Sequence, residues 1–237
     1  MSTMLQSRPA RAVTIIVRGV DIHAELTVPP DATGLVILAY PTGRSRANSK
    51  HQHLIDVLDE AGLATLFCDL LTDEEEMLSD ITGEFRHDVT LLSRRLTAIT
   101  DWCHVQPELR SMSVGYLGTG AGAAAAFISA AQRPTIVGAI VARGGRLDLA
   151  WTSLSQVRVP VLLVAGQNDD SMRESYGVCL PHIGSSCKEI AIIPHAGALF
   201  CEPTMLDKFT ERAANWLAEH LDEASGAALR WGPTGGR

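Results

Sequence analysis

The chain has 237 residues, of which 46% are hydrophobic and 20% charged, and these values predict one folded domain with a sizeable core. Twenty Lys and Arg residues stand against 27 Asp and Glu residues, so the formal net charge is −7. An acidic chain without a basic block is a poor candidate for binding nucleic acid. Five scattered cysteines without a CxxC pair disfavour a disulfide framework or a structural metal site and favour a reducing compartment.

The sequence contains no pattern typical of a membrane or secretion signal. Residues 1–11 are polar and lack the apolar stretch of a secretory signal. The longest apolar runs, such as residues 136–142, suit buried strands and are too short to cross a bilayer. We therefore expect a cytoplasmic protein with no membrane partner.

Short apolar runs alternate with longer helical patterns along most of the chain. Residues 13–17 and 22–28 predict an antiparallel pair of strands. Further strands are predicted at residues 34–40, 63–68, 113–117, 136–142, 159–165 and 189–193. Helices are predicted at residues 48–61, 84–105, 121–131 and 204–220.

This alternation predicts an α/β fold in which a doubly wound, mostly parallel sheet of about eight strands carries helices on both faces. We assign residues 1–222 to a single domain and residues 223–237, rich in Gly, Ala and Pro, to a mobile tail. The acidic run at residues 73–76 is interpreted as a solvated loop. About fifteen residues, 143–158, separate the sixth and seventh predicted strands, which leaves room for only a minimal lid.

The glycine-rich turn after the fifth predicted strand is the most informative segment, because ligands of open parallel sheets bind beyond the carboxyl ends of the strands. Gly118, Gly120 and Gly122 join that strand to an alanine-rich helix. One interpretation is a nucleotide-binding turn of the G-x-G-x-x-G type. Ala123 at the third glycine position and Ile140 at the expected acidic position disfavour it.

The other interpretation is a nucleophile elbow, G-x-S-x-G, in which Gly120 replaces the serine. Several further segments match one family in the same chain order. They are Asp69-Leu70-Leu71-Thr72, Gly118-x-x-x-Gly122 with its alanine run, Arg143-Gly144-Gly145-Arg146-x-Asp148-Leu149, Gly166-x-x-Asp169 and Leu199-Phe200-x-Glu202-Pro203. With these segments, from about residue 34 to 217, the chain resembles the dienelactone hydrolase branch of the α/β-hydrolase superfamily. The resemblance implies that fold, with a small lid.

The resemblance also implies a degenerate catalytic triad. It places the nucleophile at Gly120, the acid at Asp169 and the histidine at Ala198. The His-Gly that helps to build the family's oxyanion hole corresponds to Tyr40-Pro41, and proline removes a backbone donor. Because glycine cannot attack a carbonyl and alanine cannot accept a proton, the chain is not expected to be a serine hydrolase of the usual Ser-His-Asp mechanism.

The leading hypothesis is a pseudoenzyme that binds a small molecule or a protein partner through the vestigial pocket. Ligand contacts are then expected from Tyr40, Arg44, Gly120 and the backbone N–H of Ala121 at a helix N-terminus. No cofactor and no metal are expected. A homodimer, or a structural partnership with an active relative, also stays open.

The alternative hypothesis is an enzyme of the same family with changed chemistry. His195 lies three residues before the expected histidine position and is either a loop histidine facing water or a partner of Asp169. As a pair, His195 and Asp169 would act as general base, with the Ala121 N–H as electrophile, in a hydrolase, lyase, isomerase or cyclase.

Overall fold

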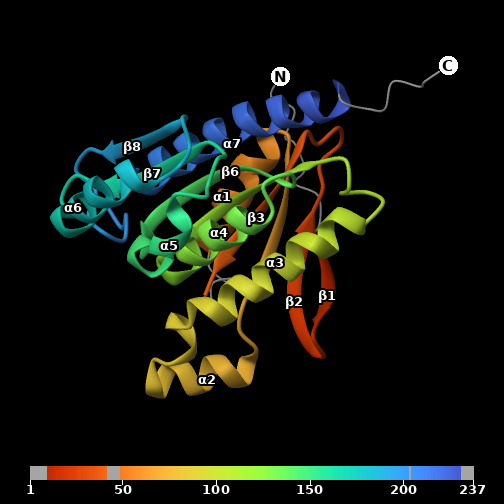
Figure 1. Cartoon of the computed structure of the whole chain (residues 1–237), viewed down its shortest axis with the longest axis horizontal. Coiled ribbons are helices and arrows are strands. Elements are labelled where there is room, and N and C mark those ends of the chain that lie inside the picture. The colour runs from red at the N-terminus through yellow and green to blue at the C-terminus, as the bar shows by residue number, and fades with distance from the viewer. Residues whose placement is uncertain (1–9, 42–48, 203, 231–237) are drawn as a thin grey trace.

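The computed structural model describes residues 10–41, 49–202 and 204–230 (Figure 1). The strands are β1 (Arg11–Val17), β2 (Val20–Thr27), β3 (Gly34–Tyr40), β4 (Leu63–Asp69), β5 (Ser113–Thr119), β6 (Val137–Gly145), β7 (Val161–Gly166) and β8 (Lys188–Ile193). The α-helices are α1 (Ser49–Glu60), α2 (Asp73–Thr82), α3 (Val89–Val105), α4 (Gly120–Gln132), α5 (Trp151–Leu154), α6 (Asp170–Cys179) and α7 (Met205–Arg230). Single turns of 3-10 helix occur at η2 (Phe85–His87), η3 (Leu147–Ala150) and η4 (Leu180–His182).

All eight strands belong to one sheet, in the order β1-β2-β4-β3-β5-β6-β7-β8. β2 pairs antiparallel with β1 and with β4, and every other neighbouring pair is parallel. This topology confirms the predicted α/β fold with its mostly parallel sheet. β6 is joined to β7 through η3 and α5, so the connection is as short as the sequence indicates.

Helices cover both faces of the sheet, and each face has its own hydrophobic core. One core includes Leu96 of α3, Phe127 of α4 and Tyr176 of α6. The other includes Leu58 of α1 and Phe209 of α7. All seven residues of β3 are buried, as expected for a parallel strand covered on both sides.

α7 packs directly on the middle of the sheet because glycines lie beneath it. A Cβ on Gly34 would lie 2.7 Å from the Cβ of Leu221, and a Cβ on Gly115 would lie 2.8 Å from a methyl carbon of Leu217. At Gly34 a Cβ would force the backbone of α7 away, because the atom it meets is itself a Cβ, whereas at Gly115 it would force the leucine side chains to move. Glycine at both positions lets the helix approach β3 and β5 this closely.

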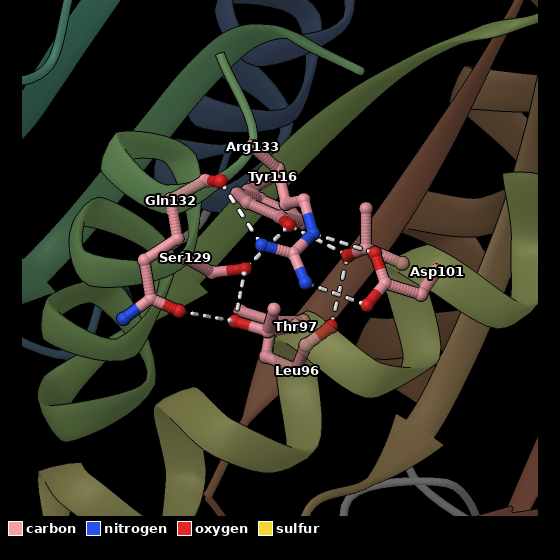
Figure 2. A network of polar contacts seen from close by, with 8 residues as sticks. Leu96, Thr97, Asp101, Tyr116, Ser129, Gln132 and Arg133 are labelled. Atoms are coloured by element: carbon pink, nitrogen blue, oxygen red, sulfur yellow. Dashed lines mark hydrogen bonds and ion pairs between the residues drawn. The ribbon is translucent and has the colours of Figure 1, made fainter. Parts of the chain in front are cut away.

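A polar network crosses the otherwise apolar space between β5, α3 and α4 (Figure 2). The hydroxyl of Tyr116 is hydrogen-bonded to Thr100 Oγ1 at 2.6 Å and to Ser129 Oγ at 2.8 Å. Ser129 is joined in turn to Thr97 at 3.0 Å. All of these side chains are buried, so the network satisfies polar groups that water does not reach.

The acidic run at residues 73–76 forms the first turn of α2, so its interpretation as a loop was wrong. Thr72 accepts a hydrogen bond from the backbone N–H of Glu75, whose carboxylate accepts one from the N–H of Thr72. This capping box starts the helix, and acidic residues near its N-terminus interact favourably with the helix dipole. In Figure 1, α2 lies at one end of the molecule.

The last helix is longer than predicted, since α7 ends at Arg230 rather than at residue 220. It therefore includes residues 223–230, which the sequence analysis assigned to a tail, because the alanines in this segment favour continuation of the helix. Residues 231–237 lie outside the described part. Among the described helices, none combines the length and the apolar character needed to cross a lipid bilayer.

Candidate functional site

The turn between β5 and α4 has the backbone shape of a nucleophile elbow, with glycine at its tip. Gly120 has φ +54°, in the left-handed region, and apart from its chain neighbours and the backbone of its own helix no described heavy atom lies within 4 Å of the position its Cβ would take. A Cβ on Gly118 would lie 2.6 Å from the Cα of Ala123, and one on Gly122 would lie 2.0 Å from the carbonyl oxygen of Ala39. The outer glycines therefore permit close packing, while the central position faces open space.

The end of β3 packs against this elbow and brings Tyr40 to the site. Tyr40 is only 5% exposed, and its ring meets His51 and Phe67 edge-on, at centroid distances of 4.9 and 5.6 Å. Burial raises the pKa of the Tyr40 hydroxyl, and the positive charge of Arg143 partly offsets that increase. Arg44, the other predicted side-chain contact, lies outside the described residues.

Asp169 follows β7 and is the N-cap of α6. Its carboxylate accepts a hydrogen bond of 3.2 Å from the backbone N–H of Met172, and the residue is half-buried. Capping in this way satisfies one of the free N–H groups at the start of the helix. Asp169, at the acid position of the triad, therefore also stabilises the start of α6.

His195 lies in the loop between β8 and α7, and hydrogen bonds from the neighbouring loop hold its backbone. Its N–H donates to Gln167 Oε1 at 2.9 Å, and its carbonyl accepts from Asn168 Nδ2 at 3.2 Å. The residue is exposed and has φ +65°. Among the described residues, no hydrogen bond or ion pair joins its imidazole to Asp169, so the structure does not bring this predicted pair into contact.

The same loop places a methyl group at the family's histidine position. Ala198 is exposed, whereas Phe200 is 2% exposed and has φ +53°. A bulky residue in the left-handed region is strained, and the surrounding structure must hold it there. The tilted contact between Phe200 and Phe209, with centroids 5.7 Å apart, is part of that support.

Arg143, at the end of β6, is a site residue that the sequence analysis did not single out. Its guanidinium carbon lies 4.9 Å from the ring centroid of Phe209 and 5.7 Å from that of Phe200. Arg143 is half-buried, and within the described part of the chain it makes no hydrogen bond or ion pair. By contrast, Arg146 donates two hydrogen bonds to Asp148, at 2.8 and 2.7 Å. The sequence signal that could have identified Arg143 is an arginine at the carboxyl end of an apolar strand.

A cavity of about 540 Å³ lies between the β1–β2 turn and the start of α2. Half of its lining residues are acidic, among them Asp21, Asp69 and Asp73, and none of the predicted catalytic residues lines it. No cluster of His, Cys, Asp and Glu side chains among the described residues is arranged to hold a metal ion.

Comparison with known proteins finds relatives of similar sequence. The chain is 38% identical over 209 residues to two proteins named "Putative phosphoribosyl transferase", from the CDC 1551 and H37Rv strains of Mycobacterium tuberculosis. The match covers 88% of this chain but only 46% of each relative, so the chain spans about half of their length.

Solved protein structures share the fold of this chain. A dienelactone hydrolase from Anabaena variabilis is 38% identical, with a TM-score of 0.86, over 91% of this chain and all of that protein. Est1E from Butyrivibrio proteoclasticus, 17% identical, shares the fold with a TM-score of 0.71 over 88% of this chain and 98% of its own. The model of the dienelactone hydrolase family matches residues 22–179. On these findings, the chain belongs to the dienelactone hydrolase family.

Proposed function

We propose that this chain is a non-hydrolytic member of its family that binds a small molecule at the carboxyl ends of β3, β5 and β6. The observation that carries the proposal is the elbow, which keeps its left-handed turn at Gly120 and the open space in front of it but supplies no nucleophile. Ala198 offers no imidazole, and Pro41 offers no backbone N–H.

Glycine at the elbow tip also has a physical consequence for the fold. A serine at φ +54° stores backbone strain, which a hydrolase tolerates because the strained turn presents the nucleophile. Gly120 adopts the same conformation with much less strain. Loss of the nucleophile therefore leaves the shape of the turn in place for binding.

The name of the mycobacterial relatives suggests phosphoribosyl transfer. We propose that this activity does not belong to the half that they share with this chain. The support is that the part shared with the relatives matches the model of the dienelactone hydrolase family. The same part is 38% identical to the Anabaena protein, which is named a dienelactone hydrolase.

The test uses a fluorophosphonate probe, which labels activated serines, together with turnover of p-nitrophenyl acetate. The unchanged protein is expected to give neither labelling nor turnover above background. The matched variant Gly120→Ser/Ala198→His restores the two missing side chains on the same scaffold and is expected to gain labelling.

Ester turnover by the unchanged protein that is lost in Asp169→Asn would overturn the proposal in favour of base catalysis by Asp169 and His195. Asparagine caps helices about as well as aspartate, so this variant removes the charge without removing the cap of α6. His195→Ala then tests the second member of the pair.

A further inference from the structure

Three polar side chains occupy the same register position on neighbouring strands. Thr119 of β5 is paired with Arg143 of β6, and the pairing of β3 with β5 makes Tyr40 level with Thr119. The residues two positions earlier on these strands belong to the core beneath α1 and α7. Because side chains alternate along a strand, all three point toward that same face, beside the elbow.

These three side chains have polar groups without partners among the described residues. Tyr40 is 5% exposed, yet its hydroxyl makes no hydrogen bond there. Thr119 is the N-cap of α4 but makes no capping hydrogen bond with its side chain. The guanidinium of Arg143 is likewise without a hydrogen bond or ion pair. Tyr40 is buried, whereas Thr119 and Arg143 are half-buried beside it. Three neighbouring polar groups that are partly shielded from water and have no partner among the described residues indicate a ligand site.

The aromatic contacts of Arg143 leave its donors available. The rings of Phe209 and Phe200 attract the positive charge through their faces, at 4.9 and 5.7 Å, and accept no ordinary hydrogen bond. Five N–H groups in a planar fork then remain for a ligand, and this fork matches the paired oxygens of a carboxylate or phosphate. The fold holds the Phe200 ring in this contact with Arg143 even though the φ of Phe200 is positive.

In the part of the chain that the structure describes, no ion pair joins Arg143 to a carboxylate. The nearest carboxylate in this row of the sheet is that of Asp69, which is paired in register with Tyr40 on β4. The nearby Arg146 differs, because Asp148 neutralises it at the surface. Arg143 therefore keeps a half-buried positive charge whose lost hydration an anionic ligand would replace.

We propose that Arg143, together with Thr119 and Tyr40, binds the carboxylate or phosphate group of a small-molecule ligand at the elbow. This inference rests on the proposed function, since it names the chemistry of the ligand for the same site. The arginine supplies the paired donors, and each hydroxyl supplies one more.

Calorimetric titration at low salt with benzoate, phenyl phosphate and the neutral benzamide tests the proposal. The unchanged protein is expected to bind one of the two anions at least about tenfold more tightly than benzamide, a difference of about 1.4 kcal/mol. Whichever anion binds more tightly distinguishes a carboxylate ligand from a phosphate ligand. Arg143→Gln is expected to abolish the preference for the anion, whereas the matched control Arg146→Gln keeps it.

Two further variants keep the test independent of folding, which circular dichroism monitors in each case. Arg143→Lys keeps the charge but loses the fork, so we expect intermediate affinity. Tyr40→Phe removes only a hydroxyl and is expected to weaken anion binding several-fold. Failure of both anions to bind, equal binding of anions and benzamide, or unchanged anion binding in Arg143→Gln would overturn the inference. Fluorophosphonate labelling of the unchanged protein would instead overturn the proposed function.

Discussion

Gly120 and Gly122 lie two residues apart in one turn, but different physical constraints favour glycine at each. At Gly120 the backbone conformation is the constraint, because φ is +54° and the described residues leave room for a side chain. At Gly122 the constraint is steric, because a Cβ would lie 2.0 Å from the carbonyl oxygen of Ala39. An alanine scan of the turn separates these two causes.

Gly120→Ala is expected to lower the free energy of unfolding by about 1 kcal/mol, the strain of one ordinary residue in the left-handed region. Gly122→Ala is expected to cost more than about 3 kcal/mol or to prevent folding, since β3 and α4 must separate. Urea unfolding at 25 °C measures both values. Equal losses in the two variants would contradict this assignment.

At the scale of elements, a buried ion pair fastens α2 to α3. Arg95 of α3 is 4% exposed and donates one hydrogen bond of 2.8 Å to the carbonyl of Leu70. It donates two more to the carboxylate of Glu75, of which the one to Oε1 is 2.8 Å long. Burial alone would raise the pKa of Glu75, but hydrogen bonds from Arg95 and from the backbone of Thr72 outweigh it, so the pKa is lowered.

Stability should therefore depend on pH through Glu75. A lowered pKa in the folded state stabilises the protein fully above the unfolded value, near 4.3, and this contribution is lost as the pH falls through the lowered pKa. Glu75→Gln is expected to cost about 2 kcal/mol at pH 7 and clearly less near pH 3, less than a fully buried pair because the Glu75 side chain is 22% exposed. Urea unfolding at both pH values measures this. Glu174→Gln, at an exposed residue, is the control, and the same loss at both pH values would contradict the assignment.

The hydroxyl network of Figure 2 gives a second prediction at this scale. Tyr116→Phe removes the hydroxyl that joins Thr100 to Ser129, and each of those residues keeps one other hydrogen bond. The expected loss of unfolding free energy is about 1 kcal/mol. Tyr40→Phe, at a hydroxyl without a described partner, is the control and should cost less. Thermal unfolding of the two variants compares them, and a larger loss in Tyr40→Phe would contradict the assignment.

At the scale of the whole molecule, the sheet could be predicted because its strands are continuous apolar runs. α2 was missed because its first turn is acidic, although Thr72-x-x-Glu75 is a visible capping signal. α6 was missed because its start depends on Asp169, which the family pattern presented as a catalytic acid. Both helices are also more polar overall than α3 and α4, which the sequence did predict.

The candidate site, like the fold, could be predicted from the sequence only in part. The elbow at Gly120 could be predicted because glycine spacing records a backbone shape. The role that we propose for Arg143 could not, because it depends on which arginine has an acidic partner. Asp148 neutralises Arg146 rather than Arg143, and no sequence pattern distinguishes the two. The sequence therefore predicts the fold but does not predict which charged side chains pair within it.

The close packing of α7 on the middle of the sheet predicts that the molecule unfolds as one unit. Leu221 is fully buried against Gly34 and Gly115, so Leu221→Ala leaves a cavity that neither glycine can fill and is expected to cost about 3 kcal/mol. Glu219→Ala, at an exposed position on the same helix, is expected to change stability by less than about 0.5 kcal/mol.

The shape of the urea transition tests the cooperativity directly. If α7 and the sheet unfold together, Leu221→Ala shifts the midpoint and leaves the dependence on urea unchanged, because the same surface is exposed on unfolding. Trp216 lies on α7 and is 6% exposed. In a variant whose other three tryptophans are replaced by phenylalanine, its fluorescence reports on undocking of the helix, while far-ultraviolet circular dichroism reports on the whole fold. Coincident transitions are expected from the two signals. An earlier fluorescence transition would mean that α7 leaves the sheet separately, and the glycines beneath it would then stabilise docking of the helix rather than the whole fold.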